Sequence, residues 1–300
     1  MNSVVTTGTE DRNSWQIALP VQAMLGERPV WDERTGTVVF VDIDRGELHR
    51  FTPGHGTSTV SVAGSVGCVG LRENGGVVLG TDAGFVLADA SGRLREEPIV
   101  PPGMTSAHFF NDGACDPAGR FVAGTSTAER TPGAAALYSL EPDGSVRTLL
   151  PEVTESNGIA WSADGRRMFY VDSGTQDVQV FDYDPTDGTV SNGRTLFSIE
   201  EQDGVPDGLI IDADDNLWLA LWSGHGLRLY RPDGELLTEI TLPAKDVTCA
   251  TFGGSDLSAL YVTTSRGYLE SDELERYPHA GDLFVLRPGA TGRNTLRYAG

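Results

Sequence analysis

The feature that most constrains the fold is a repeat of 40 to 50 residues that runs through most of the chain. Six units begin near residues 31, 71, 115, 161, 211 and 252. Each unit starts on an apolar run and continues, often past a glycine turn such as Asp164-Gly165, into a second run with alternating polar residues. Alternation is typical of half-buried strands, and a repeat of this length is typical of propeller blades.

The repeat therefore predicts an all-β fold, a six-bladed β-propeller with three or four short strands in each blade. Residues 15–300 are expected to form this single domain, and residues 1–14 a disordered N-terminal tail. Two spare strands, at residues 15–19 and 294–298, are expected to complete one blade and close the ring, because closure protects sheet edges.

Charge and cysteine content narrow the classes of partner. The 300 residues carry 43 acidic and 22 basic side chains, a net charge of −21. Such a surface repels phosphate and anionic lipid, so we expect neither nucleic-acid nor membrane binding. The sequence shows no secretory signal, and its three cysteines lack a C-x-x-C pair, which favours free thiols in the cytoplasm. A small-molecule substrate is expected, for a monomer or a small homo-oligomer.

One residue stands four positions before the start of each unit, and these six residues are expected to face the central channel. They are Glu27, Gly67, Asn111, Asn157, Asp207 and Thr248. Oxygen donors without thiolates suit a hard cation such as Ca²⁺ or Mg²⁺, and also Mn²⁺. The alternative is that Asn-Gly and Asp-Gly are ordinary turn dipeptides. The constant offset favours a site, and both interpretations stay open at this point.

Several segments, in this order along the chain, resemble the senescence marker protein (regucalcin)/gluconolactonase/luciferin-regenerating enzyme family. The resemblance extends from about Leu25 to the C-terminus. The segments that carry it are Leu25-Gly26-Glu27-Arg28-Pro29-Val30-Trp31, Phe110-Asn111-Asp112-Gly113, Cys115-Asp116-Pro117-Ala118-Gly119-Arg120, Ser156-Asn157-Gly158, Phe181-Asp182-Tyr183-Asp184 and Pro206-Asp207-Gly208.

The resemblance implies a six-bladed propeller with one divalent metal ion in a central metal-binding channel. Ca²⁺ is the first expectation, with Mg²⁺, Mn²⁺ or Zn²⁺ as the others. Carried over by position, Glu27, Asn157 and Asp207 would be the protein ligands of the metal. Asp207 would also be the catalytic residue, as a general base or by orienting the water bound to the metal. Asn111 and Glu129 would contact the substrate.

One position departs from the family pattern. Members that act on sugar lactones often carry Arg two residues before the Asn, where this chain has Phe109. Exchanging a guanidinium for an aromatic ring loses bidentate hydrogen bonding and adds apolar surface. A less sugar-like, more apolar substrate is therefore expected. His108 and Trp222 are further candidates for substrate binding, although a surface role for His108 and a packing role for Trp222 stay open.

The sequence as a whole predicts a divalent-metal-dependent hydrolase that opens a lactone or a related ester. One alternative is a metal-dependent non-hydrolytic enzyme that performs a cyclisation, elimination or rearrangement, since function lies in the site and not in the fold. Another alternative is a calcium-binding propeller without catalysis.

Overall fold

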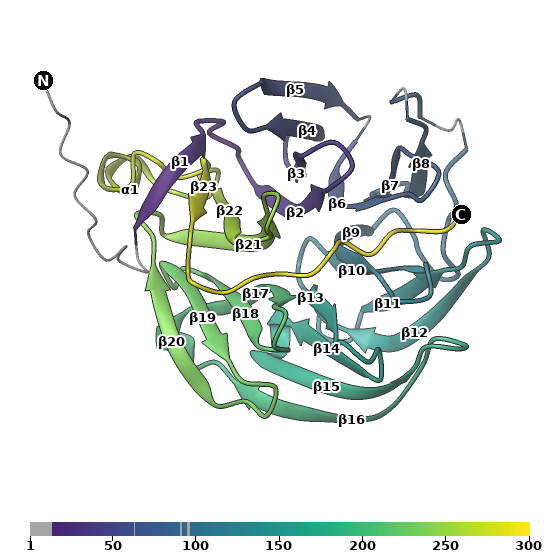
Figure 1. Cartoon of the computed structure of the whole chain (residues 1–300). Helices are drawn as coiled ribbons and strands as arrows, with labels where there is room; N and C mark the ends of the chain where they lie inside the picture. The colour runs from purple at the N-terminus through teal and green to yellow at the C-terminus, as the bar shows by residue number, and fades with distance from the viewer. Residues whose placement is uncertain (1–13, 63, 91, 95–96) are drawn as a thin grey trace, which may run out of the picture.

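The strands form six sheets arranged around a central axis (Figure 1). The computed structural model describes residues 14–300 except residues 63, 91, 95 and 96, so the expected tail lies outside the described residues apart from Ser14. Five sheets have four strands and one has three. The prediction of a six-bladed β-propeller is therefore confirmed.

The first five blades each run outward from the channel in chain order. Blade one has β2 (Gly26–Asp32), β3 (Thr37–Asp42), β4 (Glu47–Thr52) and β5 (Gly56–Ser61), and blade two has β6 (Val66–Leu71), β7 (Val77–Thr81) and β8 (Gly84–Ala88). Blade three has β9 (His108–Cys115), β10 (Phe121–Thr127), β11 (Ala135–Leu140) and β12 (Val146–Val153). Blade four has β13 (Ser156–Trp161), β14 (Arg167–Asp172), β15 (Asp177–Asp184) and β16 (Thr189–Ser198). Blade five has β17 (Val205–Ile211), β18 (Leu217–Trp222), β19 (Gly226–Tyr230) and β20 (Leu236–Thr241).

The sixth blade closes the ring with a strand from the opposite end of the chain. It contains β21 (Asp246–Gly253), β22 (Ala259–Ser265) and β23 (Leu283–Leu286), and β1 (Trp15–Leu19) pairs antiparallel with β23 as its outermost strand. The short helices η1 (Ser173–Thr175), η2 (Glu201–Asp203) and α1 (Ser271–Arg276) lie in loops. None of the helices in the described part of the chain is long and apolar enough to cross a membrane.

The closure prediction is right for residues 15–19 and wrong for residues 294–298. Once β1 has paired, β23 has a neighbour on both sides, so blade six offers no free edge beside that strand. The C-terminal segment instead runs across one end of the ring, drawn in yellow in Figure 1. There Tyr298 forms a parallel bridge with Arg72 beside blade two, and the Thr295 hydroxyl donates to the Trp31 carbonyl.

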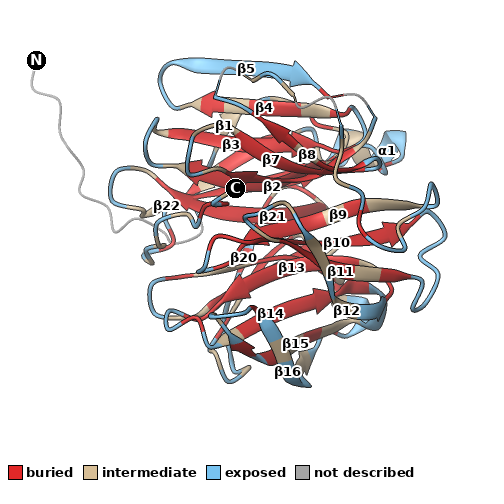
Figure 2. Cartoon of the chain, turned by 90° about the vertical axis from the view of Figure 1, so that its right-hand side faces the viewer, coloured by how far each residue is buried: buried red, intermediate tan, exposed pale blue. Residues whose placement is uncertain are grey.

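The apolar core lies mainly between neighbouring blades. The rings of Trp218 in blade five and Phe252 in blade six meet edge to face at 5.6 Å, and Phe85 packs on Phe110 at 4.3 Å between blades two and three. Figure 2 shows the buried residues along the inner strands, whereas the outer strand β5 is exposed. This packing fixes each inner strand against its neighbours, and so fixes the spacing of the residues around the channel.

Candidate metal centre

Each of the six inner strands has one extra residue in its pairing, at or beside the predicted channel position. In β9, Phe110 pairs with Thr125 and Asp112 pairs with Gly124, so Asn111 faces no residue of β10. Extra residues of this kind bend a strand and redirect a side chain, often beside a functional site. The constant offset in the sequence therefore corresponds to a strand irregularity that recurs in all six blades.

The glycines that follow Asn157 and Asp207 lie inside strands β13 and β17, and neither has a positive φ angle. A Cβ atom on Gly158 would lie 2.4 Å from the Leu209 nitrogen, and one on Gly208 would lie 2.6 Å from the Thr248 carbonyl oxygen. Glycine is needed here because neighbouring inner strands approach closely. At these two positions the dipeptide is part of a strand and not a turn.

Four of the six predicted channel residues line one cavity of about 720 Å³, which we call the metal cavity: Glu27, Asn111, Asn157 and Asp207. The other two do not line it. Gly67 has no side chain, and the Thr248 hydroxyl donates to the Gly26 carbonyl at 2.6 Å. Four separate blades thus bring two carboxylates and two amides together.

The two carboxylates of the metal cavity are buried and adjacent. Glu27 is 4 % exposed and Asp207 is 6 % exposed, and each lies close enough to perturb the pKa of the other. Burial, followed by the charge of Asp112, raises the pKa of Glu27 to about 8. Burial and the adjacent Glu27 also raise the pKa of Asp207. Two such carboxyl groups resist ionising together unless a positive charge lies beside them.

Hydrogen bonds orient the two amides. The Asn157 side-chain nitrogen donates to the Ser173 hydroxyl at 2.9 Å, and that hydroxyl donates to the Pro206 carbonyl at 2.6 Å. The Asn111 side-chain nitrogen donates to the Ser156 carbonyl at 2.9 Å. In both residues the nitrogen is therefore engaged, and the amide oxygen remains as a possible ligand.

These residues fit a hard divalent cation. Oxygen ligands from carboxylates and amides are the set that Ca²⁺ takes, and Mg²⁺ or Mn²⁺ accepts similar donors. A cation bound here would favour the ionised forms of Glu27 and Asp207, whose pKa values are otherwise raised. Glu27, Asn157 and Asp207 would hold it, with Asn111 close by.

The remaining substrate-site candidates also line the metal cavity: His108, Phe109, Glu129 and Trp222. Trp222 meets Tyr268 edge to face at 5.4 Å, and Tyr268 approaches Asp44 through its hydroxyl. Both ring nitrogens of His108 have loop partners, since Nδ1 accepts from the Thr105 amide and Nε2 lies 2.9 Å from the Ala134 carbonyl oxygen. His108 thus joins two loops beside the cavity, and its role toward substrate stays a prediction.

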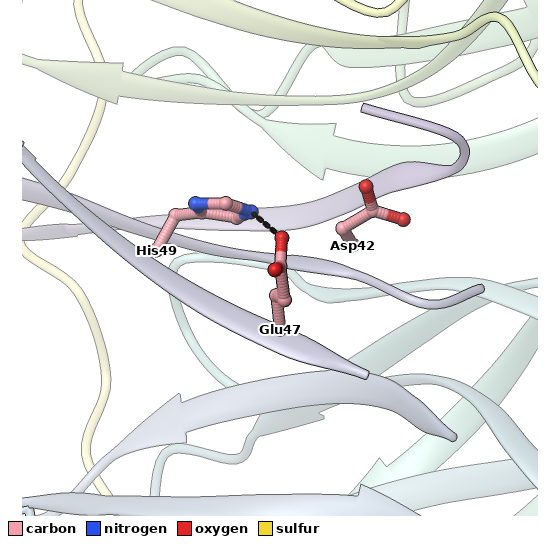
Figure 3. Close-up of side chains that lie close together, drawn as sticks. All are labelled: Asp42, Glu47 and His49. Carbon is pink, nitrogen blue, oxygen red and sulfur yellow. Dashed lines mark ion pairs between the residues drawn. The ribbon is translucent and has the colours of Figure 1, made fainter. Parts of the chain in front are cut away.

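A second group that could hold a metal lies in blade one (Figure 3). Asp42, Glu47 and His49 each offer a ligand atom, all within 4.8 Å of one another, and His49 Nε2 lies 3.5 Å from Glu47 Oε2. The Asp42 carboxylate, however, already accepts the backbone N–H groups of Met24 and Leu25. Asp42 therefore anchors the chain just before β2, and the metal cavity is the better candidate.

Three residues beside the candidate metal ligands were not identified from the sequence. Ser173, in η1, orients Asn157, but no motif marks it, because the contact depends on how β13 approaches that turn. Arg28 and Asp112 form a buried ion pair, with 3.5 Å between Arg28 Nη1 and Asp112 Oδ1. Each is adjacent in sequence to a predicted channel residue, and this adjacency was the available signal.

Fold and site together define a class, that of six-bladed propellers with a candidate hard-cation site built from their inner strands. Residues 25–266 match the family described as the SMP-30/gluconolactonase/LRE-like region, and the chain belongs to this family. The resemblance predicted from the sequence is thereby confirmed.

Relatives of known name cover almost the whole chain. Human regucalcin is 35% identical over 295 residues, which are 95% of this chain and 98% of the relative. A Bacillus subtilis protein, YvrE, named provisionally as a sugar lactone lactonase, is 35% identical over 281 residues, 93% of this chain and 96% of the relative.

Solved structures of a regucalcin and of a luciferin-regenerating enzyme superpose on almost the whole chain. The regucalcin of Agrobacterium tumefaciens, described as a calcium-binding protein, superposes with a TM-score of 0.90 at 25% identity, over 96% of this chain and 98% of the other. A luciferin-regenerating enzyme superposes with a TM-score of 0.88 at 28% identity, over 96% and 99% of the two chains.

Proposed function

We propose that this protein is a divalent-metal-dependent hydrolase that opens a lactone or a related ester. The observation that carries the proposal is the pair of buried, adjacent carboxylates, Glu27 and Asp207, beside two oriented amides in one cavity. Membership in a family whose description includes gluconolactonase supports the same reaction type. The preferred ion is Ca²⁺, as in the calcium-binding relative, with Mg²⁺, Mn²⁺ and Zn²⁺ as the other candidates.

A bound divalent cation would polarise the lactone carbonyl and lower the pKa of a nearby water. Glu27, Asn157 and Asp207 would hold the ion, and Asp207 would accept the proton of the attacking water as its oxygen bonds to the carbonyl carbon. The ring carbon–oxygen bond then breaks, and the same proton passes to the leaving ring oxygen. The product is a hydroxy acid, with one water consumed.

The proposed substrate is less sugar-like and more apolar than an aldonolactone. Phe109 and Trp222 contribute aromatic surface to the cavity wall, and Tyr268 extends this surface near the rim. Phe109 stands where sugar-lactone hydrolases of the family often carry Arg, so hydroxyl groups of a sugar would lose a bidentate donor there. Asn111, whose amide oxygen has no partner among the described residues, would accept a substrate hydrogen bond.

The test is a panel of apolar and sugar lactones assayed with the purified chain and with Asp207→Ala. We expect metal binding and turnover to be lost together in this variant, while Asp214→Ala, an exposed aspartate beyond β17, keeps both. Assays in ¹⁸O-labelled water should place the isotope in the new carboxylate.

Other outcomes would favour the alternatives. Turnover without isotope incorporation would point to a cyclisation, elimination or rearrangement. Tight calcium binding without turnover across the panel would point to a binding protein. Full activity in Asp207→Ala would refute the proposed mechanism.

A further inference from the structure

The inner strands line two cavities, one after the other along their length. Residues at the beginning of the strands line the metal cavity, whereas residues further along line a second cavity of about 230 Å³. We call this second cavity the far chamber. No residue lines both cavities. Residues 293–296 line the far chamber and belong to the C-terminal segment that crosses the end of the ring in Figure 1.

Two side chains that line the far chamber have buried donors that make no hydrogen bond to the described part of the chain. Arg28 is 8 % exposed and Trp161 is 5 % exposed. Among the described residues, Arg28 Nε, Arg28 Nη1 and Trp161 Nε1 find no hydrogen-bond acceptor. Asp112 Oδ1 lies 3.5 Å from Arg28 Nη1, which is an ion pair but too long for a good hydrogen bond, and Asp112 Oδ2 also has no hydrogen-bond partner among the described residues. Buried donors are nearly always satisfied, so the loosely paired Arg28 guanidinium and the Trp161 indole can each bond a further acceptor once a small shift of the side chain uncovers them.

The rest of the chamber wall is largely apolar and includes Val30, Leu71, Ile159, Ile211 and Phe252. A mostly apolar cavity with a few convergent polar groups is typical of a small-molecule site. An apolar cavity of about 150 Å³ is large enough for benzene. The far chamber can therefore hold one ring, or a short chain, together with a small polar head.

We propose that the far chamber binds a small apolar monocarboxylic acid, whose carboxylate accepts hydrogen bonds from Arg28 and whose body packs on the apolar wall. A guanidinium binds a carboxylate through parallel, charge-assisted hydrogen bonds, which a neutral carbonyl cannot match. Trp161 supplies one more donor to the same chamber. This site is separate from the metal cavity and does not depend on the proposed lactonase activity.

Benzoate is a suitable probe, with benzamide as its neutral counterpart, and calorimetry on the full chain gives both affinities. We expect benzoate to bind. The affinity for benzamide should be lower by a factor of about ten or more, because benzamide lacks the negative charge. The affinity for benzoate should be the same in EDTA and in saturating calcium. Binding that requires calcium would place the carboxylate on the metal and overturn the proposal.

Two variants locate the site. Arg28→Met keeps a side chain of similar length without charge and should weaken benzoate binding about tenfold or more. Trp161→Phe removes one donor and should weaken it several-fold, which gives an independent readout if Arg28→Met does not fold. Arg194→Met, at an exposed position of β16, is the matched control and should bind as the original chain does.

The proposal fails on any of three results. The first is that benzoate shows no measurable binding at millimolar concentration. The second is that both chamber variants bind benzoate with the same affinity as the control. The third is that a benzoate-soaked crystal shows only ordered water beside Arg28.

Discussion

At the scale of single residues, we propose that Phe109 sets the substrate preference of the metal cavity. It lies in β9 two residues before Asn111, and both side chains line the metal cavity. Its neighbour His108 is held by loop contacts through both ring nitrogens. Substrate preference is therefore expected to depend more on Phe109 than on the histidine beside it.

Replacing Phe109 by Arg should shift the preference toward sugar lactones. A charge-assisted hydrogen bond contributes about 1.5–3 kcal/mol, so kcat/KM for glucono-1,5-lactone should rise about tenfold or more. The same variant should lose activity on a phenyl-substituted lactone, because apolar contact is lost. Initial rates on both substrates measure the change. Phe109→Leu is the control, and an equal gain on the sugar lactone in that variant would contradict the explanation.

The sequence located the candidate ligands because each stands at a constant offset before its unit. Glu27, Asn111, Asn157 and Asp207 were found in this way, and the family resemblance then implied which of them hold the metal. The same counting could not show that Thr248 turns away, because its hydroxyl bonds to the Gly26 carbonyl of blade one across the closed ring. Nor could it find Ser173, whose contact with Asn157 depends on the fold of η1.

At the scale of elements, the close approach of the inner strands controls the site. The Asn157-Gly158 pair in β13 faces Leu209 of β17, and the extra residue of β13 falls in the same short stretch. A side chain at Gly158 would push these two strands apart. Packing between strands and the position of the metal ligands are therefore coupled.

Gly158→Ala should lower both stability and calcium affinity. Overpacking of this kind costs about 1–3 kcal/mol and moves the backbone that carries Asn157. Gly54→Ala is a useful comparison, because Gly54 has a φ of +75° and nothing within 4 Å of its added Cβ. Backbone strain at this positive φ should lower the stability of that variant by only about 1–2 kcal/mol, and its calcium affinity should not change. Urea unfolding and calcium calorimetry test both, and normal calcium binding in Gly158→Ala would contradict the coupling.

The outer and terminal elements show where sequence reasoning stops. Alternation and turns identified the blade strands, and residues 15–19 do form the closing strand. Residues 294–298 carry a similar pattern, yet they cross the end of the ring, because β1 and β22 already flank β23. Which of two terminal segments takes the last edge is decided by the whole sheet and not by local composition.

At the scale of the whole molecule, the buried carboxylates are expected to couple stability to pH and, through the proposed metal site, to calcium. Without metal, the folded chain holds a proton on Glu27 up to a pKa of about 8, whereas the ordinary value is 4.5. The unfolded chain loses that proton at lower pH, so the free energy of unfolding should fall as pH rises from about 4.5 to 8. Calcium, if bound as proposed to the ionised form, should oppose this fall.

Thermal melts between pH 4.5 and 8, in EDTA and in excess calcium, measure the effect. The melting temperature in EDTA should fall across this range, and the stabilisation by calcium should grow with pH. Glu27→Gln removes the titrating group, so its melting temperature in EDTA should change less with pH. An unaltered slope in that variant would assign the pH dependence to other groups.

The most direct test of a metal-dependent hydrolase is a calcium titration that follows binding heat and lactone turnover in the same samples. Ser173→Ala should weaken calcium binding about 10–100-fold, because Asn157 loses the hydroxyl that orients it. Ser191→Ala, at an exposed position of β16, is the control. We predict one ion per chain and a half-saturation for turnover that shifts by the same factor as the dissociation constant. Turnover that persists without divalent metal, or a half-saturation that stays fixed while binding weakens, would contradict the account.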